Sequence, residues 1–240
     1  MRKNIPNFLT LLNLFTGCVS LVLTLRGDVV TGAWLIGLAA LFDFLDGFMA
    51  RLLKAYSPIG KQLDSLADIV SFGLVPGAIF FILIEKSLGL QSHDETITAI
   101  VPFAGFIITL FSALRLAKFN VDERQEEAFY GLPTPANALL IASFPLILEQ
   151  QSTLAGLQIG IIHQALLNPF ILIVLALLLS WILVVEIRLV SLKFKTFGWK
   201  ENSSRYLLLI FSALWLLLFQ FAGIPLIIFT YIILSVSSKT

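Results

Sequence analysis

Apolar residues in this chain gather into long runs that shorter polar segments separate. A helix of roughly 18 to 22 apolar residues is long enough to cross the hydrocarbon core of a bilayer, which is about 30 Å thick. The runs predict eight membrane-spanning helices, at residues 8–25, 30–53, 66–88, 97–117, 133–149, 168–187, 206–221 and 224–238. We therefore expect an all-α, polytopic membrane helix bundle.

Composition supports the same class of protein. Hydrophobic residues make up 58% of the chain and charged residues 13%, whereas a soluble domain has about 25% charged residues. The formal net charge of +1 gives no sign of a nucleic-acid partner or of an acidic partner. The single cysteine, Cys18, excludes a disulfide within the chain.

Basic residues are distributed unevenly between the two sides of the predicted bundle. If the N-terminus lies inside, every lysine and arginine except Arg26 and Lys86 also falls inside. Positively charged loops stay in the cytoplasm, so we expect both termini and the segment between the second and third spans to be cytoplasmic. One alternative is that the first span is a signal peptide cleaved near Cys18, but its apolar run continues past this residue.

The stretch 41–70 departs from this pattern because it carries four aspartates at the edges of two apolar runs. These are Asp43, Asp46, Asp64 and Asp68. At about 100° per residue, each pair falls on one face of its helix. Ser57-Pro58 and Gly60 indicate a short turn between the two helices. We therefore expect four carboxylates to face a common cavity at the cytoplasmic boundary.

Four carboxylates in a medium of low dielectric constant repel one another and take up protons unless cations hold them. Oxygen ligands favour hard divalent cations such as Mg²⁺ or Mn²⁺. Two such ions stabilise the attacking and leaving oxygens of a displacement at phosphorus. A cation transporter or channel is an alternative, because carboxylates inside membranes often line ion paths. Against it, all four aspartates lie at one boundary, and no charged residue continues a path through the middle of a predicted span.

Small residues accompany the carboxylates on the same helical faces. Gly47, Ala50 and Gly60 would leave room for a bulky ligand close to the backbone. The alternative is close packing between helices, for which membrane proteins often use glycine. Arg51 also has two interpretations, because it can anchor the helix end at the membrane surface or contact a phosphate.

The whole pattern resembles the signature of a known family. The spacing Asp43-x2-Asp46-Gly47-x2-Ala50-Arg51-x8-Gly60-x3-Asp64-x3-Asp68 resembles that of the CDP-alcohol phosphotransferase family at every fixed position. The resemblance implies a core of six membrane helices over about residues 1–190, often in a homodimer, with about two added helices at 205–238. Residues 1–240 would then form a single integral membrane domain.

The resemblance also implies a reaction, in which an alcohol hydroxyl attacks a phosphorus of a CDP-linked substrate and CMP leaves. The four aspartates would hold two divalent cations, Mg²⁺ or Mn²⁺, and Asp68 would also act as the general base. The implied CDP-diacylglycerol site consists of Asn7, Thr10, Gly47, Ala50, Arg51, Ser57 and Gly60. For Asn7 and Thr10 the alternative is a helix start, where their side chains accept hydrogen bonds from free backbone N–H groups.

Two later segments suggest where the alcohol binds. Arg115 and Lys118 lie three residues apart on one helical face, and Asn120 follows them. Thr134 and Pro135 predict a helix start, with Thr134 as N-cap and Pro135 as the first helical residue. A positive helix terminus beside basic residues suits an anionic acceptor, and we predict acceptor contacts from Arg115, Lys118, Asn120 and Thr134. The alternatives are anchoring of the basic residues at the membrane surface and simple helix initiation.

Several segments resemble one branch of this family, the membrane-embedded bacterial phosphatidylserine synthases. These are IPNFLTLLNLFTG near the N-terminus, DSLADIVSFGLVP, RLAKFN and GLPTPA. The resemblance implies transfer of a phosphatidyl group from CDP-diacylglycerol to L-serine in the inner membrane of a bacterium. Transfer to glycerol 3-phosphate or inositol is the alternative, although a phosphorylated acceptor would need more basic residues than these segments carry.

Overall fold

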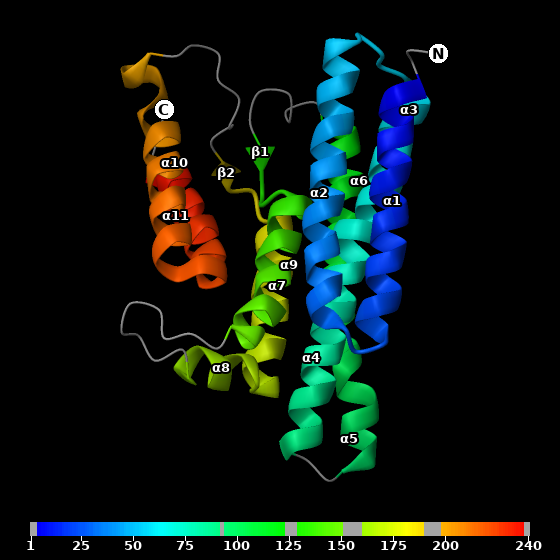
Figure 1. The fold of residues 1–240 in the computed structure, drawn as a ribbon, viewed down its shortest axis with the longest axis vertical. Helices are drawn as coiled ribbons and strands as arrows, with labels where there is room; N and C mark the ends of the chain where they lie inside the picture. Colours follow the sequence, from blue (N-terminus) through cyan, green and yellow to red (C-terminus); the bar gives the residue numbers. More distant parts are fainter. Residues whose placement is uncertain (1–3, 92–93, 123–128, 151–159, 190–197, 238–240) are drawn as a thin grey trace.

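The computed structural model of the protein describes residues 4–91, 94–122, 129–150, 160–189 and 198–237. The first five helices, in chain order, are α1 (Asn4–Leu25), α2 (Val29–Leu52), α3 (Pro58–Asp68), α4 (Val75–Gln91) and α5 (Glu95–Ile100). They are followed by α6 (Ile107–Val121), α7 (Thr134–Glu149), α8 (Gly160–Leu166), α9 (Pro169–Val184), α10 (Trp199–Phe219) and α11 (Gly223–Ser237). A π-helical segment, η1 (Ile69–Leu74), and two 3₁₀ segments, η2 (Val101–Phe106) and η4 (Gln220–Ala222), join some of them. The prediction of a helical membrane bundle is confirmed (Figure 1).

Five helical stretches are long and apolar enough to cross a membrane, among the residues that the structure describes. They are Asn4–Leu25, Val29–Leu52, Pro58–Gln91, Glu95–Val121 and Asn202–Val236, and Thr134–Glu149 and Pro169–Val184 are shorter apolar helices. All eight predicted spans overlap a helix. The last two predicted spans lie in the single stretch Asn202–Val236, which turns at Gln220, where φ is 49°. α10 and α11 therefore pack on each other as a hairpin, beside α7 (Figure 1).

Two very short strands are the exception to the all-α structure among the described residues. β1 (Phe129–Tyr130) and β2 (Arg188–Leu189) pair in antiparallel orientation, with Phe129 opposite Leu189. The backbone N–H of Gly131, whose φ is +76°, continues this contact by donating to the carbonyl of Ile187 at 2.9 Å. The pair ties the chain before α7 to the chain after α9.

α1 buries its polar side and exposes its apolar side. Its buried residues are small or polar, namely Pro6, Thr10, Asn13, Thr16, Gly17, Ser20 and Thr24. Large apolar residues such as Phe8, Phe15 and Val22 point outward. Helices in lipid gain little from burying apolar residues, and small or hydroxyl side chains let their backbones approach closely. The hydroxyl of Ser20 accordingly donates to the carbonyl of Gly32 in α2 at 2.7 Å.

α4 forms the centre of the bundle, and most of its residues are buried. The 3₁₀ segment η2 crosses it at very short range. A Cβ atom added at Gly105 would lie 2.5 Å from the backbone nitrogen of Phe81 and 2.9 Å from the carbonyl oxygen of Gly77. The two backbones therefore touch at Gly105, and only glycine fits between them.

α3 and α4 are continuous through η1, which contains one π-type turn. The N–H of Val75 donates to the carbonyl of Val70, five residues earlier, where an α-helix would use the residue four earlier. π-type turns are rare and often occur at functional sites. This one directly follows Asp68.

Candidate active site

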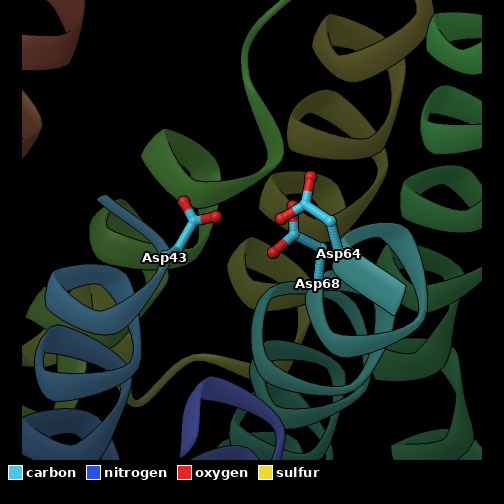
Figure 2. A group of neighbouring side chains, drawn as sticks. All are labelled: Asp43, Asp64 and Asp68. Carbon is cyan, nitrogen blue, oxygen red and sulfur yellow. The ribbon is translucent and has the colours of Figure 1, made fainter. Parts of the chain in front are cut away.

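Three of the four predicted aspartates lie together. Asp43 comes from α2, and Asp64 and Asp68 come from α3 (Figure 2). One carboxylate oxygen from each lies within 4.8 Å of the others. α1 packs against both α2 and α3 and so holds the two carboxylate-bearing helices in place. Asp43 and Asp64 are partly exposed, whereas Asp68 is buried.

The fourth aspartate, Asp46, lies outside this group of three. It is 6% exposed, and its Oδ2 accepts a hydrogen bond of 2.6 Å from the hydroxyl of Thr10 in α1. Another α1 side chain contacts the cluster itself, because Nδ2 of Asn13 donates to Oδ1 of Asp68 at 3.3 Å. Asn13 was not among the residues predicted for the site. Its position three residues after Thr10, in a helix whose polar residues recur as Asn7, Thr10, Asn13 and Thr16, was the available signal.

A cavity of about 470 Å³ opens next to the carboxylates. Its lining consists of Pro6, Asn7, Thr10, Asp46, Gly47, Ala50, Ala55, Tyr56, Ser57, Pro58, Gly60, Lys61 and Asp64. Six of the seven residues predicted for the CDP-diacylglycerol site are in this set, and Arg51 is not. Arg51 is exposed, with its guanidinium beside Gly47 one helical turn away. Lys61, which brings a positive charge to the lining, was not among the predicted residues.

Local structure around Gly60 shapes one wall of the cavity. Ser57 is the N-cap of α3, and its Oγ accepts a hydrogen bond of 2.9 Å from the N–H of Gly60. The predicted turn therefore ends before Gly60, which is the third residue of the helix, and Lys54 (φ 51°) makes the sharp bend instead. A Cβ atom at Gly60 would lie 2.9 Å from Oγ of Ser57 and 3.0 Å from Oδ1 of Asn7. Glycine here lets α1 and the α3 cap approach each other.

The residues predicted for the acceptor do not form one group. Arg115 is 6% exposed, its Nε donates to the carbonyl of Leu132 at 2.9 Å, and its guanidinium lies 5.3 Å from the ring centre of Phe119. Arg115 is also close enough to Asp68 to interact with it electrostatically. Lys118 is instead exposed on the surface of α6.

Asn120 braces two helices together. Its side-chain Nδ2 donates to the hydroxyl of Ser65 in α3 at 2.8 Å, and its backbone carbonyl accepts from Nζ of Lys61 at 3.2 Å. These contacts hold the end of α6 against the helix that carries Asp64.

The predicted start of α7 was wrong by one residue. Pro133 occupies the N-cap position and Thr134 is the first helical residue, with no side-chain cap. Pro135 is thus second in the helix, where proline is also tolerated because the first four N–H groups of a helix have no partner within it. The hydroxyl of Thr134 caps nothing and is fully buried.

The chemistry of the carboxylate group suits a divalent cation. All its donors are oxygens, the ligands that Mg²⁺ and Mn²⁺ prefer. Opposite oxygens around Mg²⁺ are about 4.2 Å apart, close to the 4.8 Å limit that encloses the oxygens of Asp43, Asp64 and Asp68. The side-chain hydrogen bonds to Asp46 and Asp68 come from neutral donors, which do not themselves neutralise the carboxylates.

The fold and the site together define an integral membrane helix bundle with an acidic centre at one end of its helices. Residues 3–185 match the CDP-alcohol phosphatidyltransferase family, and the chain belongs to this family. The family is metal-dependent, in agreement with the acidic cluster.

Curated relatives match part of the chain. A Methanocaldococcus jannaschii protein named CDP-diacylglycerol--serine O-phosphatidyltransferase is 36% identical over 140 residues, which is 58% of this chain and 59% of the relative. A Helicobacter pylori protein of the same name is 31% identical over 153 residues, 63% of this chain and 61% of the relative. An archaetidylserine synthase of Methanothermobacter thermautotrophicus is 35% identical over 144 residues, 59% of this chain and 58% of the relative. The chain thus spans about three fifths of the length of these relatives.

Proposed function

We propose that this protein transfers the phosphatidyl group of CDP-diacylglycerol to L-serine, producing phosphatidylserine and CMP. The main support is the group of three carboxylates beside a cavity that glycines leave open, in a member of the CDP-alcohol phosphatidyltransferase family. The relatives described above add support, because each is named for a reaction or product that involves serine.

Asp43, Asp46, Asp64 and Asp68 are the proposed ligands of two divalent cations, Mg²⁺ or Mn²⁺. When bound, these ions would neutralise charge on the phosphate oxygens and on the leaving CMP. Thr10 and Asn13 orient two of the carboxylates through their hydrogen bonds to Asp46 and Asp68.

The cavity is the proposed nucleotide site. Gly47 and Gly60 expose backbone where the cytidine and pyrophosphate would lie, and Asn7 and Ser57 offer polar atoms beside Gly60. Lys61 supplies a positive charge toward the pyrophosphate. Arg51 lies at the outer end of this region, where it would meet the nucleotide only if its exposed side chain turns inward.

Asp68 is the proposed general base. Asn13 donates to its Oδ1, which leaves Oδ2 to accept the proton of the serine hydroxyl. The serine oxygen then forms a bond to the β-phosphorus of CDP-diacylglycerol, and the bond from that phosphorus to the CMP oxygen breaks.

We further propose that the site and both termini face the cytoplasm of a bacterial cell and that the chain forms a homodimer. The uneven distribution of lysine and arginine supports the orientation, and the family resemblance supports the dimer. A fluorescent protein fused to the C-terminus should fluoresce, and an alkaline phosphatase fusion should be inactive. The reverse result would place the site on the other side. Crosslinking in native membranes would show whether the dimer forms.

A direct assay tests the proposed activity. Purified protein in detergent is incubated with CDP-diacylglycerol and Mg²⁺ or Mn²⁺, and separate reactions receive L-serine, glycerol 3-phosphate or inositol. Release of CMP and formation of the lipid product are measured. We expect both to depend on serine. Release of CMP that depends on one of the other two alcohols instead would show a different member of the same family.

A further inference from the structure

α7 carries two buried polar side chains to which the mechanism above gives no role. Thr134 and Asn137 are both 0% exposed. Within the described part of the chain, the hydroxyl of Thr134 and both polar atoms of the Asn137 amide have no hydrogen-bond partner. Buried polar groups are nearly always paired, and leaving one unpaired costs about 1–3 kcal/mol. Such a pair within one helical turn therefore points to a partner that is not part of the chain.

Both residues belong to the end of α7 that meets the acidic site. α7 packs against α2, which carries Asp43. In Figure 2 the green first turn of α7 and the loop that leads into it lie beside the Asp43 carboxylate. The loop is fixed there by Arg115, whose Nε donates to the carbonyl of Leu132.

Helix geometry directs the Asn137 amide toward the same place. Residues three apart lie on one face of a helix, so Thr134 and Asn137 share a face. Side chains in a helix tilt toward its N-terminus, and the amide of Asn137 therefore points toward the turn that holds Thr134. That turn also presents the free N–H groups and the positive dipole end of a 16-residue helix.

The chemistry of these groups matches a small zwitterion. A primary amide donates through Nδ2 and accepts through Oδ1, so Asn137 can donate to a carboxylate and accept from an ammonium group. The helix terminus adds further donors for the carboxylate. Neither Thr134 nor Asn137 carries the positive charge that a phosphorylated acceptor would require.

We propose that Asn137, assisted by Thr134, positions the amino-acid acceptor by binding both its ammonium and its carboxylate groups. The inference rests on the proposed function and extends it. Asn137 would be the residue that selects a zwitterionic amino alcohol over a phosphorylated or neutral polyol. Asn137 is a positioning residue here and takes no part in the transfer of the proton or of the phosphatidyl group.

The first test compares Asn137→Leu with the wild type. Leucine keeps the size of the side chain and removes both polar atoms. We expect the KM for serine to rise about 10- to 100-fold, with the KM for CDP-diacylglycerol changed by less than about twofold. Thr134→Val should raise the KM for serine by a smaller factor. Thr24→Val is the matched control, because the hydroxyl of Thr24 is also fully buried and has no hydrogen-bond partner among the described residues. Thr24 lies in the last turn of α1, at the end of this helix away from the acidic site. Thr24→Val should leave both values unchanged.

A second variant separates binding from folding. Asn137→Asp keeps an acceptor for the ammonium group and replaces the donor for the carboxylate with a negative charge. The rate with serine should fall, and the rate with ethanolamine relative to serine should rise, because ethanolamine lacks the carboxylate. A purely structural role of Asn137 predicts no such shift in preference. An unchanged KM for serine in a folded Asn137→Leu protein, or an unchanged serine-to-ethanolamine preference in Asn137→Asp, would overturn the inference. In that case the wild type would still make phosphatidylserine, whereas failure of the proposed function would appear in the wild type itself.

Discussion

The aspartates that α1 contacts receive hydrogen bonds from neutral side chains. Thr10 donates to Asp46 and Asn13 to Asp68. A lysine or arginine in either place would neutralise the carboxylate and compete with a cation for it. A hydroxyl or an amide fixes the position of the carboxylate and leaves its charge available. The arrangement is suited to holding an ion and would be a poor way of merely stabilising a fold.

Asp68 carries the first prediction. Asp68→Asn keeps the shape of the side chain but cannot accept the proton of the alcohol. We expect kcat to fall about 10²- to 10⁴-fold, with a much smaller change in the affinity for CDP-diacylglycerol. Steady-state kinetics and binding of labelled CDP-diacylglycerol measure the two effects. Asp28→Asn is the control, since Asp28 is the N-cap of α2 and asparagine caps equally well. Equal, modest losses in binding and turnover would leave Asp68 as a ligand only.

Gly60 carries the second prediction. In Gly60→Ala the new methyl group would lie 2.9 Å from Oγ of Ser57 and 3.0 Å from Oδ1 of Asn7. Both side chains can move, but the Ser57 cap, worth about 1 kcal/mol, and the position of Asn7 in the cavity would be lost. We expect a higher KM for CDP-diacylglycerol and a modest loss of stability. Gly37→Ala should change neither, because nothing lies within 4 Å of the added atom. Unchanged kinetics in Gly60→Ala would show that Asn7 and Ser57 are not part of the proposed nucleotide site.

Most residues of the site could be predicted from the sequence because they share one motif with fixed spacing. The aspartates and glycines of α2 and α3 belong to it, and the cavity lining includes most of them. Asn13 and Asn137 could not be predicted in this way, since a single asparagine in an apolar helix has several roles and only burial distinguishes them. Arg115 and Lys118 both lie on α6 but differ in exposure, because another helix can cover one position on a helix and leave its neighbour open.

At the scale of elements, the crossing of α4 and η2 depends on backbone contact. The rings of Phe103 and Phe106 in η2 contact the ring of Phe81 in α4. Gly105 is what lets these rings reach α4. The apolar runs predicted the helices well, but neither the 3₁₀ segment at 101–106 nor the π turn at 69–74 was predicted. Both depend on contacts with distant helices and not on local propensity.

The third prediction tests this crossing. In Gly105→Ala the added Cβ atom would overlap the backbone of Phe81, which cannot rotate away. We expect a loss of about 1–3 kcal/mol in the free energy of unfolding, measured by unfolding in mixed detergent micelles. Gly89→Ala in α4 is the matched control, because nothing lies within 4 Å of its added Cβ atom. Its stability should be unchanged or slightly higher, since alanine favours a helix over glycine by up to about 1 kcal/mol. Equal stabilities would mean that the helices separate at little cost.

At the scale of the whole molecule, the site combines four helices that differ in what they contribute. α2 and α3 bring the carboxylates, α1 orients them, and α7 closes the group from the side (Figures 1 and 2). The carboxylates of the acidic cluster lie close together in a partly buried site, where their negative charges destabilise the fold unless a positive charge compensates them. Binding of cations should therefore stabilise the whole bundle as well as permit turnover.

The fourth prediction follows from this coupling. Exhaustive chelation should abolish release of CMP and lower the melting temperature of the protein in detergent, and Mg²⁺ or Mn²⁺ should restore both. In Asp64→Asn the melting temperature should respond less to the added ion, because one negative ligand is lost. Turnover that continues undiminished after chelation would contradict a metal-dependent mechanism, and a melting temperature that ignores both ions would contradict the coupling.

The π turn between Asp68 and α4 has a consequence for how the length of this segment can change. Each residue inserted into or deleted from a helix rotates everything beyond it by about 100°. Removing one residue from Ile69–Leu74 would convert the segment into ordinary α-helix. Because a π turn holds one residue more than an α turn, this deletion would leave Asp64 and Asp68 on the same face relative to α4, and they would still lie beside Asp43. Single-residue deletions here should therefore leave a folded, inserted protein that keeps more activity than one with the same deletion inside α3, where the carboxylates would rotate by about 100°, and release of CMP measures the difference.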